Sequence, residues 1–533
     1  MSGLILVWAA VPFLWILANE PFNDFFVARS LAGVELAASS GFHLQLLWGA
    51  DIHPSLETLL LMLNQTLSIK PEYLQYLPIG GVARLVTLFA LARRFLKSSL
   101  MGALVASTAA FDYSLGVSVN TIFTHSFGFS IYFSFLLGYL VMPESGRAWN
   151  YVLLTVLFVG ANFFSYVSAV WIIVFLGFML LIPLMTWLGK VNKTSSTPPT
   201  VRWSLLVAFV VIFFGFNQVV YNVYLVNFLQ RDYSLVLFRF IGSLVPSRGT
   251  ELSYRPPVPA ALPALNVGYT TLILFFPTLF VLCTVFRRIR LKSKGVPHPN
   301  LNLLLWSMVL TAVFDSGLYF IYGYFDIKYV SIMFPLVSAI VLRYFAFGSQ
   351  LSSSQANPRG TDVLHHSGAA MRPKLVRLAT LLFLALILTT NVARFGLSIS
   401  ANQFSRFSNT DATPGGNWLM ESYRYHPHIL SDMSTLGKLD MAAAGYNRQI
   451  GEVFYTLGIY NYVVQSETDQ TKFNDSSDFI VVDAGNRVAG TNTEFWNILP
   501  PIAPSLPSLG RHTDFNQVYS DGNLVIFAVK PTP

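Results

Sequence analysis

The sequence predicts a polytopic α-helical membrane protein with a soluble α/β or α+β domain at its C-terminal end. Its 533 residues are 53% hydrophobic, 15% aromatic and only 11% charged, and the mean hydropathy is +0.54. Apolar runs of about 18 residues recur, each long enough to cross a hydrocarbon core of roughly 30 Å. This composition excludes a soluble globular protein.

The apolar runs predict about eleven membrane spans, with ends uncertain by a few residues. The first lacks the positive n-region and small-residue cleavage site of a signal peptide, so we expect it to be retained. The predicted spans are roughly 3–19, 77–95, 100–118, 122–142, 150–167, 168–188, 203–226, 268–286, 301–322, 328–346 and 375–393.

Basic residues in the short loops predict the orientation. With a cytoplasmic N-terminus, every strongly basic short loop, including the run from Arg287 to Lys294, falls on the cytoplasmic side. The net charge of +8 therefore indicates membrane orientation and not nucleic-acid binding. The apolar stretch from Leu56 to Leu67 is too short to cross the membrane. Counting it as a span would also place the later basic loops on the outer side, so we expect an interfacial helix there. The outer loop then extends over 19–76.

The second predicted domain, 395–533, is extracytoplasmic in this topology and follows a membrane domain, 1–394. Its FIVVDAG stretch has the pattern of a buried strand. VYSDGNLVIFAV predicts a hairpin with Asp521-Gly522 near its turn. The stretch ILSDMSTLGKLDMAAAGYN is expected to be helical.

Acidic residues concentrate in the outer loop. Glu20 and Asp24 are spaced i, i+4, which places both carboxylates on one face if the stretch is helical. Asp51 and His53 follow before Pro54, a residue suited to the first position of a helix. A carboxylate at the membrane surface can act as general base toward an acceptor hydroxyl. The alternative is that Glu20 and Asp24 cap a helix leaving the membrane.

Three other polar residues adjoin or interrupt the apolar runs. Asp315 lies inside a predicted span, and an intramembrane carboxylate is a candidate functional residue. It either lines a pocket or is a partner for Lys328. Asp112 and His125 flank an outer turn, where they either line a pocket or cap helix ends.

Three stretches resemble the GT-C glycosyltransferase superfamily. They are Asp24 followed by DIHPSLETLLLML, then LPIGGVARLVTLFALARRFL with Arg84 near its outer end, and GYFDIKYVSIMFPLVSAIV with Lys328. The closest resemblance is to the protein O-mannosyltransferase and aminoarabinose-transferase-like branch, whose enzymes use polyprenyl-phosphate sugars.

The resemblance implies sugar transfer from a polyprenyl-phosphate-linked donor to a protein, glycan or lipid acceptor. Asp24 would be the base, with Glu20 as the other candidate, and Lys328 would hold the donor phosphate. A divalent cation such as Mg²⁺ or Mn²⁺ is left open. Further phosphate ligands would come from Arg231, Arg239 and Arg255, and the pocket would be lined by Asp51, His53, Arg84, His125 and Asp315.

Two other functions are compatible with the sequence. A transporter or flippase of a lipid-linked or amphiphilic solute would place ionisable residues at mid-span and would often show repeated halves. Here the carboxylates gather in a surface loop and no duplication is evident. A non-enzymatic membrane scaffold would leave the crowded outer loop unexplained.

Overall fold

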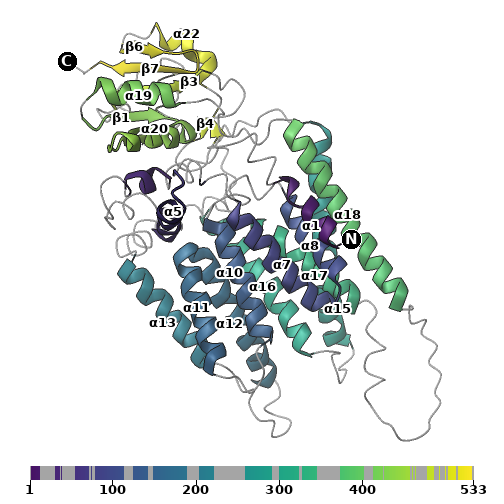
Figure 1. The fold of residues 1–533 in the computed structure, drawn as a ribbon. Coiled ribbons are helices and arrows are strands. Elements are labelled where there is room, and N and C mark those ends of the chain that lie inside the picture. The colour runs from purple at the N-terminus through teal and green to yellow at the C-terminus, as the bar shows by residue number, and fades with distance from the viewer. Residues whose placement is uncertain are drawn as a thin grey trace, which may run out of the picture.

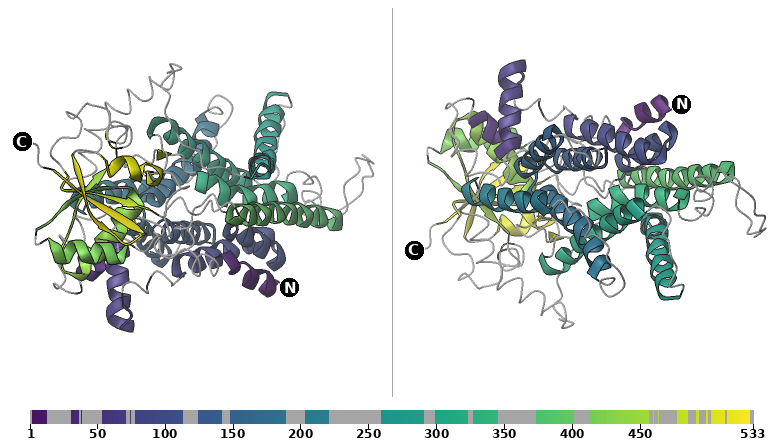
Figure 2. Two further views of the ribbon diagram at one scale, coloured as in Figure 1. Left: turned by 90° about the horizontal axis from the view of Figure 1, so that it is seen from above. Right: turned by 90° about the horizontal axis from the view of Figure 1, so that it is seen from below.

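The protein consists of a helix bundle and a smaller α/β domain, here called the C-terminal domain, which lies over one end of the bundle (Figures 1 and 2). That end is called the domain end below. The computed structural model describes residues 2–12, 31–36, 38, 54–70, 74, 78–112, 124–141, 148–188, 203–220, 259–290, 299–322, 327–344, 373–400, 412–423, 425–455, 459, 463, 477–484, 491–492, 498–499, 502–511 and 514–530.

A helix occurs within each predicted span. The bundle helices are α1 (Ser2–Trp8), α7 (Ile79–Leu96), α8 (Ser99–Ala110), α10 (Thr124–Val141), α11 (Ala148–Phe164), α12 (Tyr166–Leu188), α13 (Trp203–Val220), α15 (Ala261–Arg290), α16 (Pro299–Tyr322), α17 (Ile327–Tyr344) and α18 (Pro373–Ser400).

Within the described residues, three helical segments are both long and apolar enough to cross a membrane: Ser168–Met185, Ala261–Thr284 and Lys374–Ser398. The other bundle helices from α8 onwards contain shorter apolar stretches of 10–17 residues. The protein is therefore mostly helical and has helices that are long and apolar enough to cross a membrane. The count of about eleven spans stays a prediction.

The segment that we expect to lie along the membrane interface forms α5 (Pro54–Leu67), which begins at the predicted proline. Its 14 residues extend about 21 Å at 1.5 Å per residue, less than the hydrocarbon thickness. Met62 is 60% exposed and Leu67 51% exposed, as expected for an apolar helix whose outer face meets lipid headgroups.

The bundle core is rich in aromatic side chains. Phe158 of α11 and Phe209 of α13 stack with centroids 4.2 Å apart, while Phe135 of α10 meets the same Phe209 edge-on. Helices also approach closely where small residues face each other. At Gly128 of α10, an added Cβ would lie 2.6 Å from Cβ of Ser165 and also meet Ser168.

We expect Gly128→Val to destabilise the bundle by about 1–3 kcal/mol, because the new side chain would force α10 away from Ser165 and Ser168. The loss is measurable as a lower free energy of unfolding in detergent micelles. Gly177→Val in α12 is the matched control, since nothing lies within 4 Å of an added Cβ there. Equal losses in the two variants would contradict the close packing at Gly128.

The C-terminal domain has a five-stranded mixed sheet. Its strands are β1 (His428–Ser431), β2 (Gly451–Phe454), β3 (Phe479–Asp483), β6 (Phe515–Ser520) and β7 (Leu524–Val529), in the order β2-β1-β3-β7-β6. Strand β1 pairs in parallel with both β2 and β3. Strand β7 runs antiparallel to β3 and β6. A separate two-stranded sheet joins β4 (Thr491–Asn492) and β5 (Ile498–Leu499).

Alternating side chains build a core on each face of this sheet. Ile429, Val481 and Ile526 pack with α19 (Thr413–Ser422) and α20 (Met433–Gly445). Ile480 and Phe527 pack on the other face, which the turn η3 (Ala503–Ser505) and α22 (Leu506–Leu509) help to cover. Burial on both faces explains the continuous apolar run of β3.

The local predictions in this domain are confirmed with one difference. Strand β3 occupies FIVVD, and β6 and β7 form the hairpin. Gly522 has φ +87°, and Asp521 Oδ1 accepts from the backbone N–H groups of Asn523 and Leu524 at 2.8 and 2.7 Å. The stretch expected to be helical from Ile429 instead begins as β1, because its first residues are buried between β2 and β3. The helix starts at Met433.

Candidate functional site

Two buried polar clusters lie toward the domain end of the bundle. The Asp112 cluster comprises Asp112, Tyr269, Asn391 and Arg394, and the Asp315 cluster comprises Tyr132, Trp171, Asp315 and Tyr329. All eight side chains are at most 5% exposed. Polar and charged groups buried at this depth are costly unless they pair or serve a function.

The Asp112 cluster contains a buried ion pair. Asp112 follows the C-cap residue of α8, and its Oδ1 lies 3.7 Å from Nη1 of Arg394 in α18. The hydroxyl of Tyr269 in α15 donates to Oδ2 of Asp112 at 3.1 Å. Three helices that are far apart in the sequence therefore meet at one carboxylate.

Further contacts fix the Arg394 guanidinium. Its Nε donates to Oδ1 of Asn266 at 2.8 Å, and Nη1 donates to Oδ1 of Asn391. The group lies 4.0 Å from the ring centroid of Tyr269, a cation–π contact. Asn391 in turn donates to the carbonyl of Thr108 at 2.9 Å. This network gives Arg394 one defined orientation.

Arg84, predicted from the sequence to line the pocket, belongs to the same region. It lies in α7, is 1% exposed, and interacts electrostatically with Asp112. Arg84 of α7 thus adds positive potential at the Asp112 carboxylate, with which Arg394 of α18 forms the ion pair. Arginine in such a setting is suited to bidentate binding of a carboxylate or phosphate.

The Asp315 cluster is built on aromatic side chains. Nε1 of Trp171 in α12 donates to Oδ1 of Asp315 in α16 at 2.9 Å. The hydroxyls of Tyr132 in α10 and Tyr329 in α17 are 2.9 Å apart. The ring centroids of Trp171 and Tyr329 lie 5.1 Å apart, so the two hydrogen-bonded pairs are in contact through these rings.

The first turn of α17 connects the two clusters. Tyr329 belongs to the Asp315 cluster, whereas the carbonyl of Ser331 accepts from the hydroxyl of Tyr269 at 3.5 Å, the limit for a hydrogen bond. Lys328 precedes Tyr329 in this turn, although its side chain lies outside the described residues. The backbone of Lys328 therefore lies directly before the residues of α17 that contact the two clusters.

The outer loop starts beside the Asp112 cluster. Helix α1 packs against α8 through Trp8 and Phe111, whose ring centroids are 4.5 Å apart, and Ser107 Oγ donates to the carbonyl of Ile5 at 3.4 Å. Ala9 and Ala110 are buried together. The chain therefore enters segment 13–30 next to the residue that precedes Asp112.

Most predicted site residues lie outside the described part of the chain: Glu20, Asp24, Asp51, His53, Arg231, Arg239 and Arg255. The backbone of His125 is in the first turn of α10, but its side chain is not described. Arg84 and Asp315 are buried in the bundle, each near a different cluster. Asp315 pairs with Trp171; its predicted alternative partnership with Lys328 stays a prediction.

Sequence reasoning did not identify Arg394 as a partner of Asp112. The sequence predicts Asp112 only as a pocket residue or a helix cap, and Arg394 follows the last predicted span, 375–393. A usable signal was present, because each is a charged residue at the edge of a long apolar segment. Such residues often pair with one another across a bundle.

We expect Trp171→Phe to destabilise the bundle by about 1–3 kcal/mol, since it removes the donor to a buried carboxylate and leaves the ring contacts largely intact. Thermal unfolding in detergent, followed by circular dichroism, measures the loss. Trp306→Phe is the control, because Trp306 is only partly buried and packs at the edge of the core. A Trp171 variant as stable as wild type would show that the hydrogen bond contributes little.

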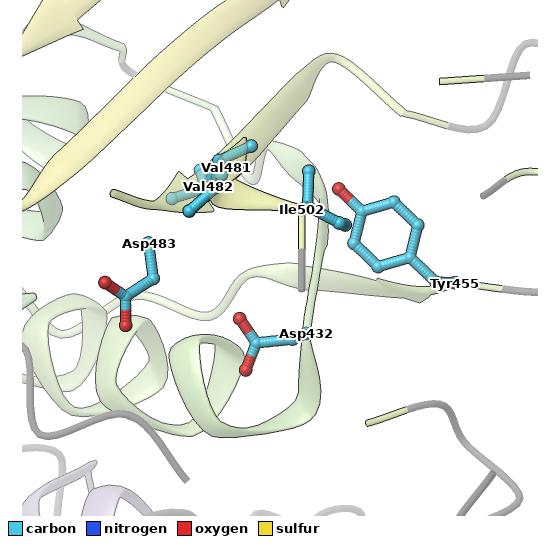
Figure 3. Close-up of a pocket in the computed structure, with 7 residues that line it drawn as sticks. Asp432, Tyr455, Val481, Val482, Asp483 and Ile502 are labelled. Carbon is cyan, nitrogen blue, oxygen red and sulfur yellow. The ribbon is translucent and has the colours of Figure 1, made fainter. Parts of the chain in front are cut away.

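The C-terminal domain contains a shallow pocket at the carboxyl ends of two parallel strands (Figure 3). Asp432 follows β1 and Asp483 ends β3, with Tyr455 and Ile502 beside them; the empty volume, including its opening, is about 220 Å³. Asp432 also caps α20 by accepting from Thr435 N and Oγ1 at 3.1 and 2.7 Å. Across the described residues, no three His, Cys, Asp or Glu side chains gather as a metal site.

These features define a polytopic membrane protein whose buried charged groups lie under an α/β domain. The fold can also be compared with that of solved structures. Over 99% of its length the chain matches the crystal structure of the Archaeoglobus fulgidus oligosaccharyltransferase in the apo form, with a TM-score of 0.50, 13% sequence identity and coverage of 74% of that chain. This similarity shows that the chain has a fold like that of the oligosaccharyltransferase. No protein-family model matches the sequence, and no curated protein matches it.

Proposed function

We propose that the protein is a membrane glycosyltransferase that moves a sugar from a polyprenyl-phosphate-linked donor to a protein, glycan or lipid acceptor. The observation that carries the proposal is the fold, which is similar to that of an oligosaccharyltransferase over 99% of this chain. A fold alone does not define a reaction. The polar residues at the domain end supply the chemical part of the argument.

In the proposed reaction, Asp24 accepts the proton of the acceptor nucleophile as it attacks the anomeric carbon, and Glu20 is the second candidate. The bond from the anomeric carbon to the donor phosphate oxygen breaks, and the polyprenyl phosphate leaves. Segment 13–30, which carries both carboxylates, begins beside the Asp112 cluster. General-base catalysis of this kind contributes about 10²- to 10⁴-fold to rate.

Lys328 is proposed to hold the donor phosphate, with one or more of Arg231, Arg239 and Arg255. Lys328 lies at the start of α17, directly before the residues of this helix that contact the two buried polar clusters, and this position supports the assignment. Arg84 is proposed to contribute positive potential from within the bundle. The apolar helix surfaces, such as the exposed Val207 and Val211 of α13, are compatible with a lipid chain.

The orientation is part of the proposal. A cytoplasmic N-terminus puts the C-terminal domain and the Asp112 cluster on the extracytoplasmic side, where a lipid-linked donor no longer needs a nucleotide. No glycine-rich nucleotide-binding motif occurs in the sequence.

The test is a transfer assay with purified protein in lipid nanodiscs, using radiolabelled polyprenyl-phosphate mannose and polyprenyl-phosphate glucose. Each donor is supplied with Mg²⁺, with Mn²⁺ or with EDTA. Wild type is expected to release polyprenyl phosphate from at least one donor, and Asp24→Asn to release far less. Equal release by both proteins, or by neither, would overturn the assignment. Movement of an intact donor between leaflets would instead favour a flippase.

A further inference from the structure

Helix α20 of the C-terminal domain contacts the outer loop directly. Ala444 is 1% exposed and is buried together with Ala32 and Leu36. Met441, one helical turn earlier, packs against the same residues and against the neighbouring cluster of Leu31 and Val34. In Figure 1 the two parts of the protein approach each other at α5 and α20.

Residues 31–36 are helical and use two faces. Leu31 and Val34, spaced i, i+3, pack with Leu60 and Leu61 of α5. Ala32 and Leu36, spaced i, i+4, pack with Ala444. These spacings put each pair on its own face of the helix. The segment is therefore held between α5 on one side and α20 on the other.

Each partner is itself anchored. Phe127 of α10 packs against the cluster formed by Leu31, Val34 and α5, and its ring stacks on Phe164 of α11 at 5.2 Å. On the other side, α20 is fixed in its domain by a different face, where Leu436, Leu439 and Ala443 join the sheet core. Residues 31–36 thus bridge the bundle and the C-terminal domain.

We propose that α20 positions the outer loop for the reaction, with Ala444 and Met441 as positioning residues. This inference rests on the proposed function. The described residues on either side of segment 13–30 are both anchored, those before it by the contact of α1 with α8 and those after it, 31–36, by docking on α20. The position of a catalytic group on that segment therefore depends on both anchors. Misplacement by about 1 Å can lower a rate by about 10²-fold.

The central variant is Ala444→Leu, which adds bulk where Ala32 and Leu36 are buried. We expect kcat for release of polyprenyl phosphate to fall at least tenfold while KM for the donor changes less than threefold. Leu36→Ala in the same chain removes bulk from the facing side and is expected to restore most of the lost kcat. A general loss of domain stability would not be corrected by a substitution in the outer loop.

Ala443→Val is the matched control. Ala443 precedes Ala444 but points into the domain core with Leu436 and Leu439, so the substitution perturbs the domain without touching the loop. We expect kcat to stay within threefold of wild type. The contact itself is tested by a cysteine pair, Leu36→Cys with Ala444→Cys, after replacing the native Cys283 by serine.

The outcomes separate the two proposals. Failure of the cysteine pair to cross-link under oxidation would overturn the docking. Cross-linking together with a fully active Ala444→Leu variant would overturn the positioning role while leaving the proposed function intact. A wild type that transfers no sugar would overturn the proposed function, and with it the role of α20.

Discussion

Arg394→Met is expected to lower the free energy of unfolding by about 3–5 kcal/mol, because it removes the guanidinium that forms an ion pair with the buried Asp112 carboxylate. The guanidinium also makes hydrogen bonds to Asn266 and Asn391 and lies over Tyr269. Methionine fills much of the volume, so the loss reports charge and hydrogen bonding more than packing. SDS titration of the purified protein in mixed micelles measures the difference.

Two further variants separate the causes. Arg377→Met changes an exposed arginine of the same helix and is expected to cost less than about 0.5 kcal/mol. Arg394→Met combined with Asp112→Leu removes both charges, and is expected to recover part of the loss, since an apolar pair avoids the desolvation of a buried charge. If the double variant lost more free energy of unfolding than Arg394→Met and Asp112→Leu lose together as single variants, the ion-pair account would be contradicted.

The helical part of the fold was predictable because hydrophobic length is a local property. Runs such as 168–188 and 375–393 give α12 and α18, and residues 56–67 give α5. The C-terminal hairpin was equally local, because Asp521 and Gly522 fix the turn. By contrast, the strand β1 was missed, since its identity depends on pairing with β2 and β3, which lie farther along the chain.

The candidate site was only partly predictable for a related reason. Arg84 and Asp315 stood out as polar groups in apolar segments, and both are buried toward the domain end of the bundle. Their surroundings depend on contacts between distant helices: Asp112 with Arg394, 282 residues later, and Trp171 with Asp315. Periodicity and spacing contain no information about such pairings. The same holds for the docking of Leu36 on Ala444.

Asp24→Asn is expected to lower kcat for sugar transfer by about 10²- to 10⁴-fold, because an amide is isosteric with the carboxylate but cannot accept the acceptor proton. KM for the donor is expected to change little, since the donor phosphate is held by cationic side chains in the proposed site. Initial rates of polyprenyl phosphate release at saturating donor measure the effect. Glu20→Gln is the matched control, being the neighbouring carboxylate on the same helical face if this segment is helical.

The comparison of the two variants decides which carboxylate acts as base. If Asp24 is the base, Asp24→Asn loses the steep dependence of kcat on pH that the wild type shows near the pKa of a carboxyl group, whereas Glu20→Gln keeps it. Wild-type activity then rises with pH through that pKa, because only the ionised carboxylate accepts a proton. The reverse pattern would assign the base to Glu20. A pH profile unchanged in both variants would place the base elsewhere, and Asp112, beside which segment 13–30 begins, would be the next carboxylate to replace.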